Sequence, residues 1–378
     1  MSKEEKNLSA QMRGELDQMV PYEAGKPIEE IRREYDLDFQ PVKLASNENP
    51  FSPPPELREA YLAEFEQLNR YPDGGCYYLQ EKLAEKYNWP AEGIILGSGS
   101  DEILDCLAKA MLCPGSEVLT ADPAFIRYRM GALMMGATPV EVPVDENLDF
   151  DLDRMADNIT ADTRWICFSN PNNPTARYVN RKELTDFISK IPDSCLLILD
   201  EAYFEFVDQP DYPDGINFLR ESLSGGCPIV VLRTFSKVFG LAGLRVGYGL
   251  MDPRLAAEIH KVRPPFNVTR PSQAVALAAL EADGYLEDVR KSIGDERRRL
   301  VLELESRGFN VVPPSANFML VGTDADGGGE LIYEELLKRG VIVRSMAPYG
   351  LDRYFRLTVG RPRENDQFLA ALDEIGGF

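Results

Sequence analysis

Short apolar segments alternate with helical stretches over residues 57–263, and this alternation restricts the fold more than any other feature of the chain. A strand followed by a helix and another strand is the pattern of a mostly parallel sheet. We therefore predict an α/β domain with a seven-stranded sheet. Its strands are expected at residues 93–96, 117–120, 139–142, 165–168, 195–199, 228–232 and 244–248.

A second, smaller domain is expected after the break at Arg263-Pro-Pro-Phe266, since 378 residues exceed one typical domain. We predict a large domain over 46–265 and a small α+β domain over 266–378. An N-terminal arm over 1–45, with a break at Pro21-Tyr22, is expected to join the small domain. The pattern predicts helices within 1–20, at 28–35, 271–307 (interrupted), 330–339 and 364–375, and strands at 309–312, 317–321, 341–343 and 354–359.

The composition excludes several classes of function. The chain has 41 Lys and Arg residues against 62 Asp and Glu residues, a formal net charge of −21. This charge argues against a nucleic-acid or anionic-membrane surface, although a few arginines suffice to make one pocket positive. Six cysteines without a C-x-x-C pair and a single histidine, His260, argue against a metal site. With reduced thiols and no apolar N-terminal segment, we expect a cytoplasmic protein.

One lysine lies in the run Arg233-Thr-Phe-Ser-Lys-Val-Phe-Gly-Leu-Ala-Gly-Leu-Arg245. A lysine that forms a Schiff base must be held away from bulk water so that its amine is neutral and nucleophilic. Lys237 fits this requirement, and Thr234, Ser236 and Arg245 could bind a phosphate beside it. Taken alone, the run reads equally well as a turn with a solvated lysine.

Two more polar clusters follow predicted strands. Ser169-Asn-Pro-Asn-Asn-Pro-Thr175 follows the strand at 165–168, and Asp200-Glu-Ala-Tyr203 follows the strand at 195–199. In an open α/β sheet, ligands bind outside the carboxyl ends of the strands. Three strand ends are therefore expected to bring an amide, a carboxylate and the Lys237 amine to one edge of the sheet.

A helix is expected to begin within Gly97-Ser-Gly-Ser-Asp-Glu102, directly after a strand. Such a helix start offers unpaired N–H groups and a favourable dipole end to a phosphate. Glu102 stands where the third glycine of a dinucleotide-binding fingerprint would be, so NAD binding is not supported. By itself the segment reads equally well as a capped helix start.

This ordered set of motifs resembles the fold-type I pyridoxal-phosphate aminotransferases, which have a three-layer large domain that binds the cofactor. The resemblance implies that Lys237 binds pyridoxal 5′-phosphate and moves the proton from the substrate Cα. It further implies that Asp200 pairs with the ring nitrogen and that Tyr203 and Asn173 contact the ring O3′. Phe125 corresponds to the aromatic residue that stacks on the ring, unless it is only a core aromatic.

The resemblance also implies a phosphate site and a dimer. The cofactor phosphate is expected to bind Ser100, Asp101, Thr234, Ser236 and Arg245. Tyr71 is similar to a tyrosine that reaches the cofactor phosphate of the neighbouring subunit, which implies a homodimer with shared active sites. A simpler alternative for Tyr71 is an aromatic side chain packed beside a proline turn.

Three further residues are expected to bind substrate. Arg356 resembles the arginine that holds the carboxylate of glutamate, and Arg344 is a second candidate anion ligand. Tyr22 matches a residue near the substrate phosphate, and it fits equally well as an aromatic side chain packed beside a proline turn. For the two arginines, surface salt bridges are the alternative. Ala176 stands where the family usually has glycine, which matters if the backbone there needs a positive φ, and Arg361 is a further cation of undecided role.

The segments flanking the core, such as Lys43-Leu-Ala-Ser-Asn-Glu-Asn-Pro50, favour the histidinol-phosphate branch of the family. This implies transamination between L-histidinol phosphate and 2-oxoglutarate, a ping-pong reaction of histidine biosynthesis. An aromatic amino acid aminotransferase and a threonine-phosphate decarboxylase share the core and stay open as alternatives. A non-catalytic pyridoxal-binding regulator is remote, because only some 45 residues precede the core.

Overall fold

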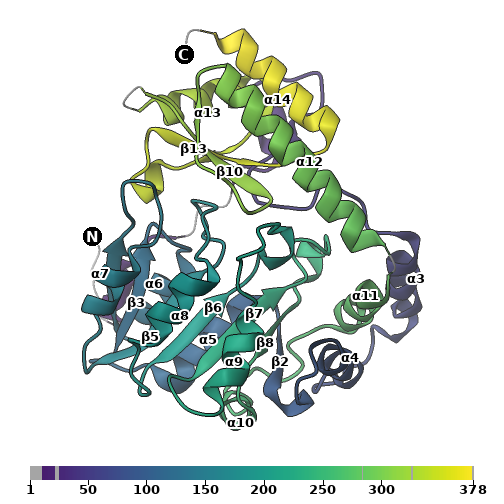
Figure 1. The fold of residues 1–378 in the computed structure, drawn as a ribbon. Helices are drawn as coiled ribbons and strands as arrows, with labels where there is room; N and C mark the ends of the chain where they lie inside the picture. The colour runs from purple at the N-terminus through teal and green to yellow at the C-terminus, as the bar shows by residue number, and fades with distance from the viewer. Residues whose placement is uncertain (1–10, 22–24, 283, 325–326, 377–378) are drawn as a thin grey trace.

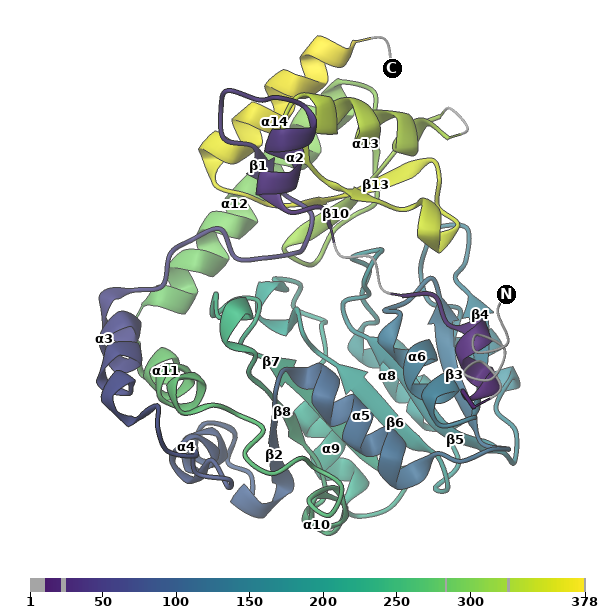
Figure 2. The same ribbon diagram turned by 180° about the vertical axis from the view of Figure 1, so that it is seen from behind.

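The computed structural model describes residues 11–21, 25–282, 284–324 and 327–376 (Figure 1). Its larger part is built on a seven-stranded sheet, and its smaller part is built on a four-stranded sheet. The long helix α12 (Tyr285–Ser306) runs between the two parts in both views (Figures 1 and 2). No helix in the described ranges has the length and apolar character needed to cross a membrane.

The large sheet confirms the predicted α/β fold. Its strands lie in the order β2-β8-β7-β6-β5-β3-β4, and only β8 runs antiparallel to its neighbours. The strands are β2 (Ile94–Gly97), β3 (Glu117–Asp122), β4 (Thr138–Pro143), β5 (Thr163–Ser169), β6 (Leu196–Asp200), β7 (Ile229–Thr234) and β8 (Gly247–Leu250).

Side chains of one strand enter two cores, one on each face of this sheet. In β6, Leu197 and Leu199 join one core cluster, whereas Leu196 and Ile198 join the other, because successive side chains of a strand point to opposite faces. Helices cover both faces and produce three layers (Figures 1 and 2). One face carries α7 (Leu152–Asp157), α8 (Arg181–Ile188) and α9 (Gly215–Ser222), and the other carries α5 (Ser100–Met111), α6 (Arg127–Met134) and α10 (Pro253–Ile259).

Three helices pack together at the β2 edge of the large sheet (Figure 2). They are α3 (Pro55–Ala63), α4 (Tyr77–Tyr87) and α11 (Arg270–Glu281). The helix predicted over 271–307 is thus two helices, α11 and α12, separated by a turn at which Gly284 has a positive φ. Because α11 packs on α3 and α4, the domain division at 265/266 stays a prediction.

The smaller part holds an antiparallel sheet in the order β12-β13-β10-β9. Its strands are β9 (Asn310–Val311), β10 (Phe318–Gly322), β12 (Arg344–Ser345) and β13 (Tyr354–Thr358), and its helices include α12, α13 (Gly328–Lys338) and α14 (Pro362–Ile375). The N-terminal segment joins this part, because β1 (Val42–Lys43) pairs in parallel with β11 (Val341–Ile342). Ile31 of helix α2 (Ile28–Glu34) packs in a small core with Leu337 of α13 and Ile342 of β11.

Two local predictions need correction. The strand expected at 244–248 begins at Gly247, because Ala242–Leu244 form a 3-10 turn and Arg245 has a left-handed φ of 53°. Of the helix expected within 1–20, the described residues contain a five-residue 3-10 helix, Gly14–Gln18.

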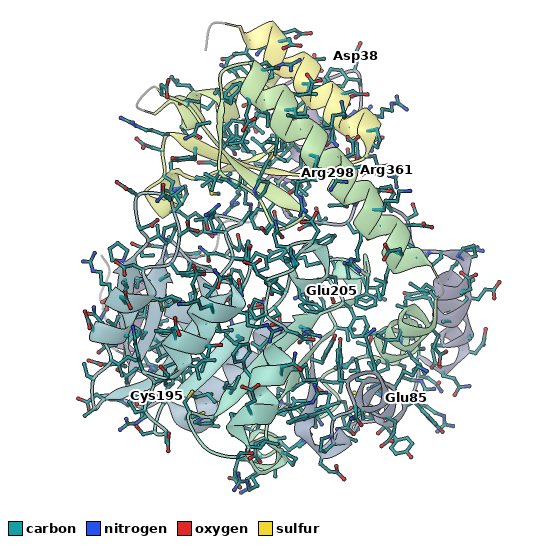
Figure 3. The ribbon with its side chains drawn as sticks, in the orientation of Figure 1. Asp38, Glu85, Cys195, Glu205, Arg298 and Arg361 are labelled. Carbon is teal, nitrogen blue, oxygen red and sulfur yellow. The ribbon has the colours of Figure 1, made fainter. Side chains whose placement is uncertain are left out.

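The carboxyl ends of the parallel strands face the smaller part. Figure 3 shows Cys195, immediately before β6, at the far end of the sheet. Glu205, shortly after β6, lies on the side of the smaller part (Figure 3). Residues at this edge therefore meet residues of the smaller sheet.

Candidate active site

A cavity of about 430 Å³ lies where the carboxyl ends of the large sheet meet the smaller sheet. Every predicted site residue except Tyr22 and Tyr71 lines it. The structure thus brings together side chains that are up to 256 positions apart, from Ser100 to Arg356. The role of each of these residues stays a prediction.

Lys237 lies in the turn that follows β7. Its Nζ donates a hydrogen bond to the Ser46 carbonyl at 3.3 Å and lies 5.4 Å from the ring centroid of Tyr203. The turn itself is fixed locally, because the Ser236 amide donates to Thr234 Oγ1 at 3.0 Å. The amine is therefore held inside the cavity against a backbone acceptor and the face of an aromatic ring.

An anion cradle forms where the start of α5 meets β8. Arg245 Nη1 donates to Ser236 Oγ at 3.3 Å. A Cβ atom on Gly99 would lie 2.5 Å from Arg245 Nη2, and one on Gly247 would lie 2.3 Å from the Ser100 amide nitrogen. Glycine at these two positions lets the guanidinium, the hydroxyl and the helix N-terminus approach one another, which is an arrangement that binds phosphate.

Asp200 ends β6 and is only 4% exposed. Its Oδ2 accepts a hydrogen bond from Tyr128 Oη at 3.0 Å, and its Oδ1 accepts one from the Ala202 amide at 3.1 Å. Both of these donors are neutral, and burial raises the pKa of Asp200 to about 6. A cation placed against this carboxylate would favour its charged form.

Tyr203 is buried beside the cavity, and its hydroxyl accepts a hydrogen bond from Asn47 Nδ2 at 3.0 Å. Burial raises the pKa of Tyr203 to about 12, so its hydroxyl keeps its proton at neutral pH. The hydroxyl is therefore positioned to donate a hydrogen bond to an anionic oxygen in the cavity.

The smaller sheet contributes two arginines that lie directly opposite each other, Arg344 in β12 and Arg356 in β13. Arg356 is buried, and its two terminal nitrogens donate to Asn173 Oδ1 and to the Ala45 carbonyl, the latter at 2.9 Å. These bonds tie the smaller sheet to the loop after β5. They also fix the guanidinium of Arg356 in the wall of the cavity, which Arg344 lines as well.

Comparison with known proteins identifies the family. The model of the family "aminotransferase class I and II" matches residues 40–372. The chain belongs to this family. Histidinol-phosphate aminotransferase 2 of Carboxydothermus hydrogenoformans is 42% identical over 96% of this chain and 99% of its own length, and histidinol-phosphate aminotransferase of Bacillus velezensis is 39% identical over 97% and 99%.

A solved structure gives the same result for the fold of this aminotransferase. Histidinol-phosphate aminotransferase of Sinorhizobium meliloti, in complex with pyridoxal-5′-phosphate, superimposes with a TM-score of 0.87 at 26% identity. The match covers 97% of each chain. The predicted fold class and aminotransferase family are therefore confirmed.

The cofactor of this aminotransferase is pyridoxal 5′-phosphate, and the cavity fits it. Asp200 is a buried carboxylate with neutral hydrogen-bond donors, which a protonated ring nitrogen would complement. Gly99 and Gly247 open the cradle in which a phosphate would meet Ser236 and Arg245. The buried carboxylate thus complements the charge of the cofactor ring, and the two glycines leave room for its phosphate.

Among the cavity residues that received no role from the sequence, three make hydrogen bonds to predicted site residues. Tyr128 fixes Asp200, and Asn47 fixes Tyr203. Ser46 offers its carbonyl to Lys237. The spacing of Tyr128, three residues after Phe125, was a signal for the first, because the two rings pack edge to face across the turn that leads into α6, with centroids 5.8 Å apart. For Ser46 and Asn47 the only signal was the family phrase around them.

Tyr71 and Tyr22 are the two predicted residues not found at this cavity. Tyr71 is 78% exposed and stacks on Phe266, with ring centroids 4.6 Å apart. A role toward a neighbouring subunit is compatible with this exposure and stays a prediction. Tyr22 lies outside the described residues.

Ala176 adopts φ 60°, in the left-handed region that favours glycine. It is fully buried, and its carbonyl accepts a hydrogen bond from the Ser315 amide at 2.9 Å. The position therefore needs the positive φ for which the family's glycine is suited, and alanine meets that need at a steric cost.

Proposed function

We propose that this aminotransferase transfers the amino group of L-histidinol phosphate to 2-oxoglutarate, as part of histidine biosynthesis. The observation that carries the proposal is the charge of the cavity. In a chain with a net charge of −21, the charged residues lining it are five cations, Arg127, Lys237, Arg245, Arg344 and Arg356, and two carboxylates, Asp101 and Asp200. This excess suits a phosphorylated cofactor, a phosphorylated donor and a dicarboxylate acceptor. The similarity to histidinol-phosphate aminotransferases supports the choice of donor.

Within this proposal the two arginines of the smaller sheet select the substrates. Arg356 has its guanidinium fixed by Asn173 and the Ala45 carbonyl, so it presents a rigid fork to a carboxylate. Arg344, opposite it in the sheet, is assigned to the second anionic group of either substrate. A rigid fork of this kind costs little conformational entropy on binding.

We assign to Lys237 the transfer of the proton from the substrate Cα. Its Nζ lies in the cavity against the Ser46 carbonyl, so it is placed to remove the proton from Cα and to return it. When bound, pyridoxal 5′-phosphate withdraws electrons from Cα through its protonated ring. Asp200 would keep the nitrogen of the bound ring protonated, and Tyr128 holds the Asp200 carboxylate in place.

We further propose that the protein is a cytoplasmic homodimer in which each active site is formed by residues of both subunits. Large apolar side chains are exposed along α3, α4 and the segment between them, including Leu62, Phe65, Leu68, Tyr71, Tyr77 and Tyr78. A second copy of the chain would cover this surface and place Tyr71 against the cofactor phosphate of its partner. Sedimentation equilibrium would test the dimer, and a Tyr71→Ala variant mixed with an inactive Lys237→Ala variant would test the sharing of sites.

A single-turnover titration of the cofactor-loaded protein tests the substrate. Loss of the aldehyde-form absorbance would be followed with L-histidinol phosphate, L-phenylalanine and L-threonine phosphate, while carbon dioxide is monitored. We expect fast conversion with histidinol phosphate alone and no carbon dioxide. Faster conversion with phenylalanine would identify an aromatic aminotransferase, and release of carbon dioxide from threonine phosphate would identify a decarboxylase.

A further inference from the structure

Arg127 lines the cavity but has no role in the proposed transamination. It is the first residue of α6. Phe125, two positions earlier, lines the cavity, and Tyr128, the next residue, is fully buried and donates to Asp200. The backbone of Arg127 is thus held close to the carboxylate that marks the cofactor ring.

The hydrogen-bonding groups of Arg127 are only partly satisfied. Its Nη2 donates to Asp105 Oδ1 at 2.6 Å, which orients the guanidinium between α5 and α6. Its Nη1 meets the Met130 sulfur at 4.0 Å, and a thioether is a weak acceptor. Its Nε is inaccessible to water and has no acceptor within hydrogen-bond distance among the described residues. Because Nη1 has only this weak acceptor in the described part of the chain, the guanidinium gains from an anion that accepts its terminal N–H groups.

The other cations of the cavity already have assignments, which leaves Arg127 for a different anion. Arg245 lies in the cofactor-phosphate cradle, Lys237 is the proposed base, and Arg356 faces the carboxylate. Arg344 alone would have to balance the two negative charges of a phosphate monoester. A second arginine would bring the charges into balance.

The wall between Arg127 and Arg344 is continuous. Phe125 and Ile126, directly before α6, and Met130, within it, line both the cavity and the groove next to it. Arg344 lines the same two hollows. Arg127 and Arg344 therefore line the same cavity, and the residues next to Arg127 in the chain also line the groove that Arg344 shares.

We propose that Arg127 is a further specificity-determining residue, which binds the phosphate group of the amino donor together with Arg344. This inference rests on the proposed function. The ligand chemistry is a phosphate monoester, and the cofactor carries one too, so the test must separate the phosphate of the donor from that of the cofactor.

The test uses cofactor-loaded Arg127→Gln and two amino donors in the same half-reaction. L-Histidinol phosphate carries a phosphate, and L-glutamate does not. We expect the second-order rate constant for histidinol phosphate to fall about 10- to 100-fold, the size of a lost charged hydrogen bond. The constant for glutamate and the dissociation constant of the cofactor should change less than about threefold.

Matched variants keep the test decisive. Arg254→Gln removes an arginine that also lies at a helix start beside a carboxylate, Asp252, but that does not line the cavity, and it should leave both rates unchanged. Arg127→Lys keeps the charge and should recover part of the histidinol-phosphate rate. If Arg127→Gln fails to fold with Asp105 unpaired, the double variant Arg127→Gln/Asp105→Asn replaces it.

Equal losses with both donors, a lost cofactor, or no loss at all would each overturn the inference. No recovery in Arg127→Lys would do the same. The proposed function is judged separately, by the unmodified protein. If that protein does not prefer histidinol phosphate to phenylalanine, the function itself fails, whatever the Arg127 variants do.

Discussion

Arg233 and Glu201 form a buried ion pair directly behind the cofactor-binding edge of the sheet. Arg233 Nε and Nη2 donate to Glu201 Oε2 at 3.0 and 2.7 Å, and the guanidinium carbon lies 3.8 Å from the ring centroid of Phe204. Glu201 follows Asp200 in the chain, and Arg233 precedes Thr234. The pair therefore joins the ends of β6 and β7, which carry two of the predicted cofactor ligands.

Removing one member of this pair should destabilise the protein strongly. Arg233→Met leaves the Glu201 carboxylate buried without its partner, and we expect a loss of roughly 3–5 kcal/mol in the free energy of unfolding. The double variant Arg233→Met/Glu201→Leu should recover part of this loss, since it removes the buried Glu201 charge as well, while the Gly215 amide loses its acceptor and Asp214 loses its ion-pair partner. Denaturant unfolding measures both. A double variant as unstable as the single one would mean that packing, not charge, is responsible.

Asp200→Asn should stabilise the cofactor-free protein while it impairs cofactor binding. The pKa of Asp200 is raised from 3.8 to about 6 by burial, so its ionised form costs roughly 3 kcal/mol above pH 6. Below about pH 4 the carboxyl is protonated in both folded and unfolded protein, and the cost disappears. The stability gained by Asp200→Asn should thus grow from pH 4 to pH 6 and then stay constant. Thermal unfolding across this range, with and without cofactor, checks the sign.

Gly247→Ala should weaken the cofactor-phosphate cradle. The added Cβ would lie 2.3 Å from the Ser100 amide nitrogen, so the start of α5 must move. We expect cofactor affinity to fall at least about tenfold, because the N–H groups of a helix start bind phosphate only when they are aligned. Gly243→Ala is the control, since its Cβ would meet nothing within 4 Å. Titration of both cofactor-free variants gives the comparison, and equal affinities would refute the role of the cradle.

Ala176→Gly should be nearly neutral, whereas Ala176→Val should be severely destabilising. Glycine relieves a left-handed strain of roughly 1–2 kcal/mol. It also loses a buried methyl group, worth about 0.8 kcal/mol, and adds unfolded-state entropy worth about 0.4–1 kcal/mol. Valine keeps the positive φ and crowds it with a branched Cβ in a fully buried site. Midpoints of urea unfolding would measure both effects.

Lys237→Ala should abolish turnover and covalent attachment of the cofactor. The expected loss follows from removing the only assigned base at the substrate Cα. Borohydride reduction followed by mass spectrometry should find the added cofactor mass in the unmodified protein and not in the variant. Lys261→Ala, which removes an exposed lysine paired with Glu258, should retain both properties. A fully active Lys237→Ala variant would remove Lys237 from the mechanism.

The sequence by itself determined the large sheet and most residues of the cavity. Buried parallel strands need continuous apolar runs, so they stand out from the helices between them. The polar residues that end such runs must share one edge, which is why the order of the motifs alone predicts that Asn173, Asp200 and Lys237 lie together. The order of apolar runs and polar clusters along the chain is therefore enough to predict this part of the site.

Only the tertiary structure decided how the smaller sheet and the N-terminal segment complete the wall of the cavity. Arg356 reaches the Ala45 carbonyl across 311 positions, and Asn47 reaches Tyr203 across 156. The two-residue strands β1 and β12 depend on partners far along the chain and have no local pattern of their own. Likewise, the left-handed φ of Ala176 is compatible with its sequence but not required by it. Contacts of this kind arise from the packing of distant segments, which local propensity does not encode.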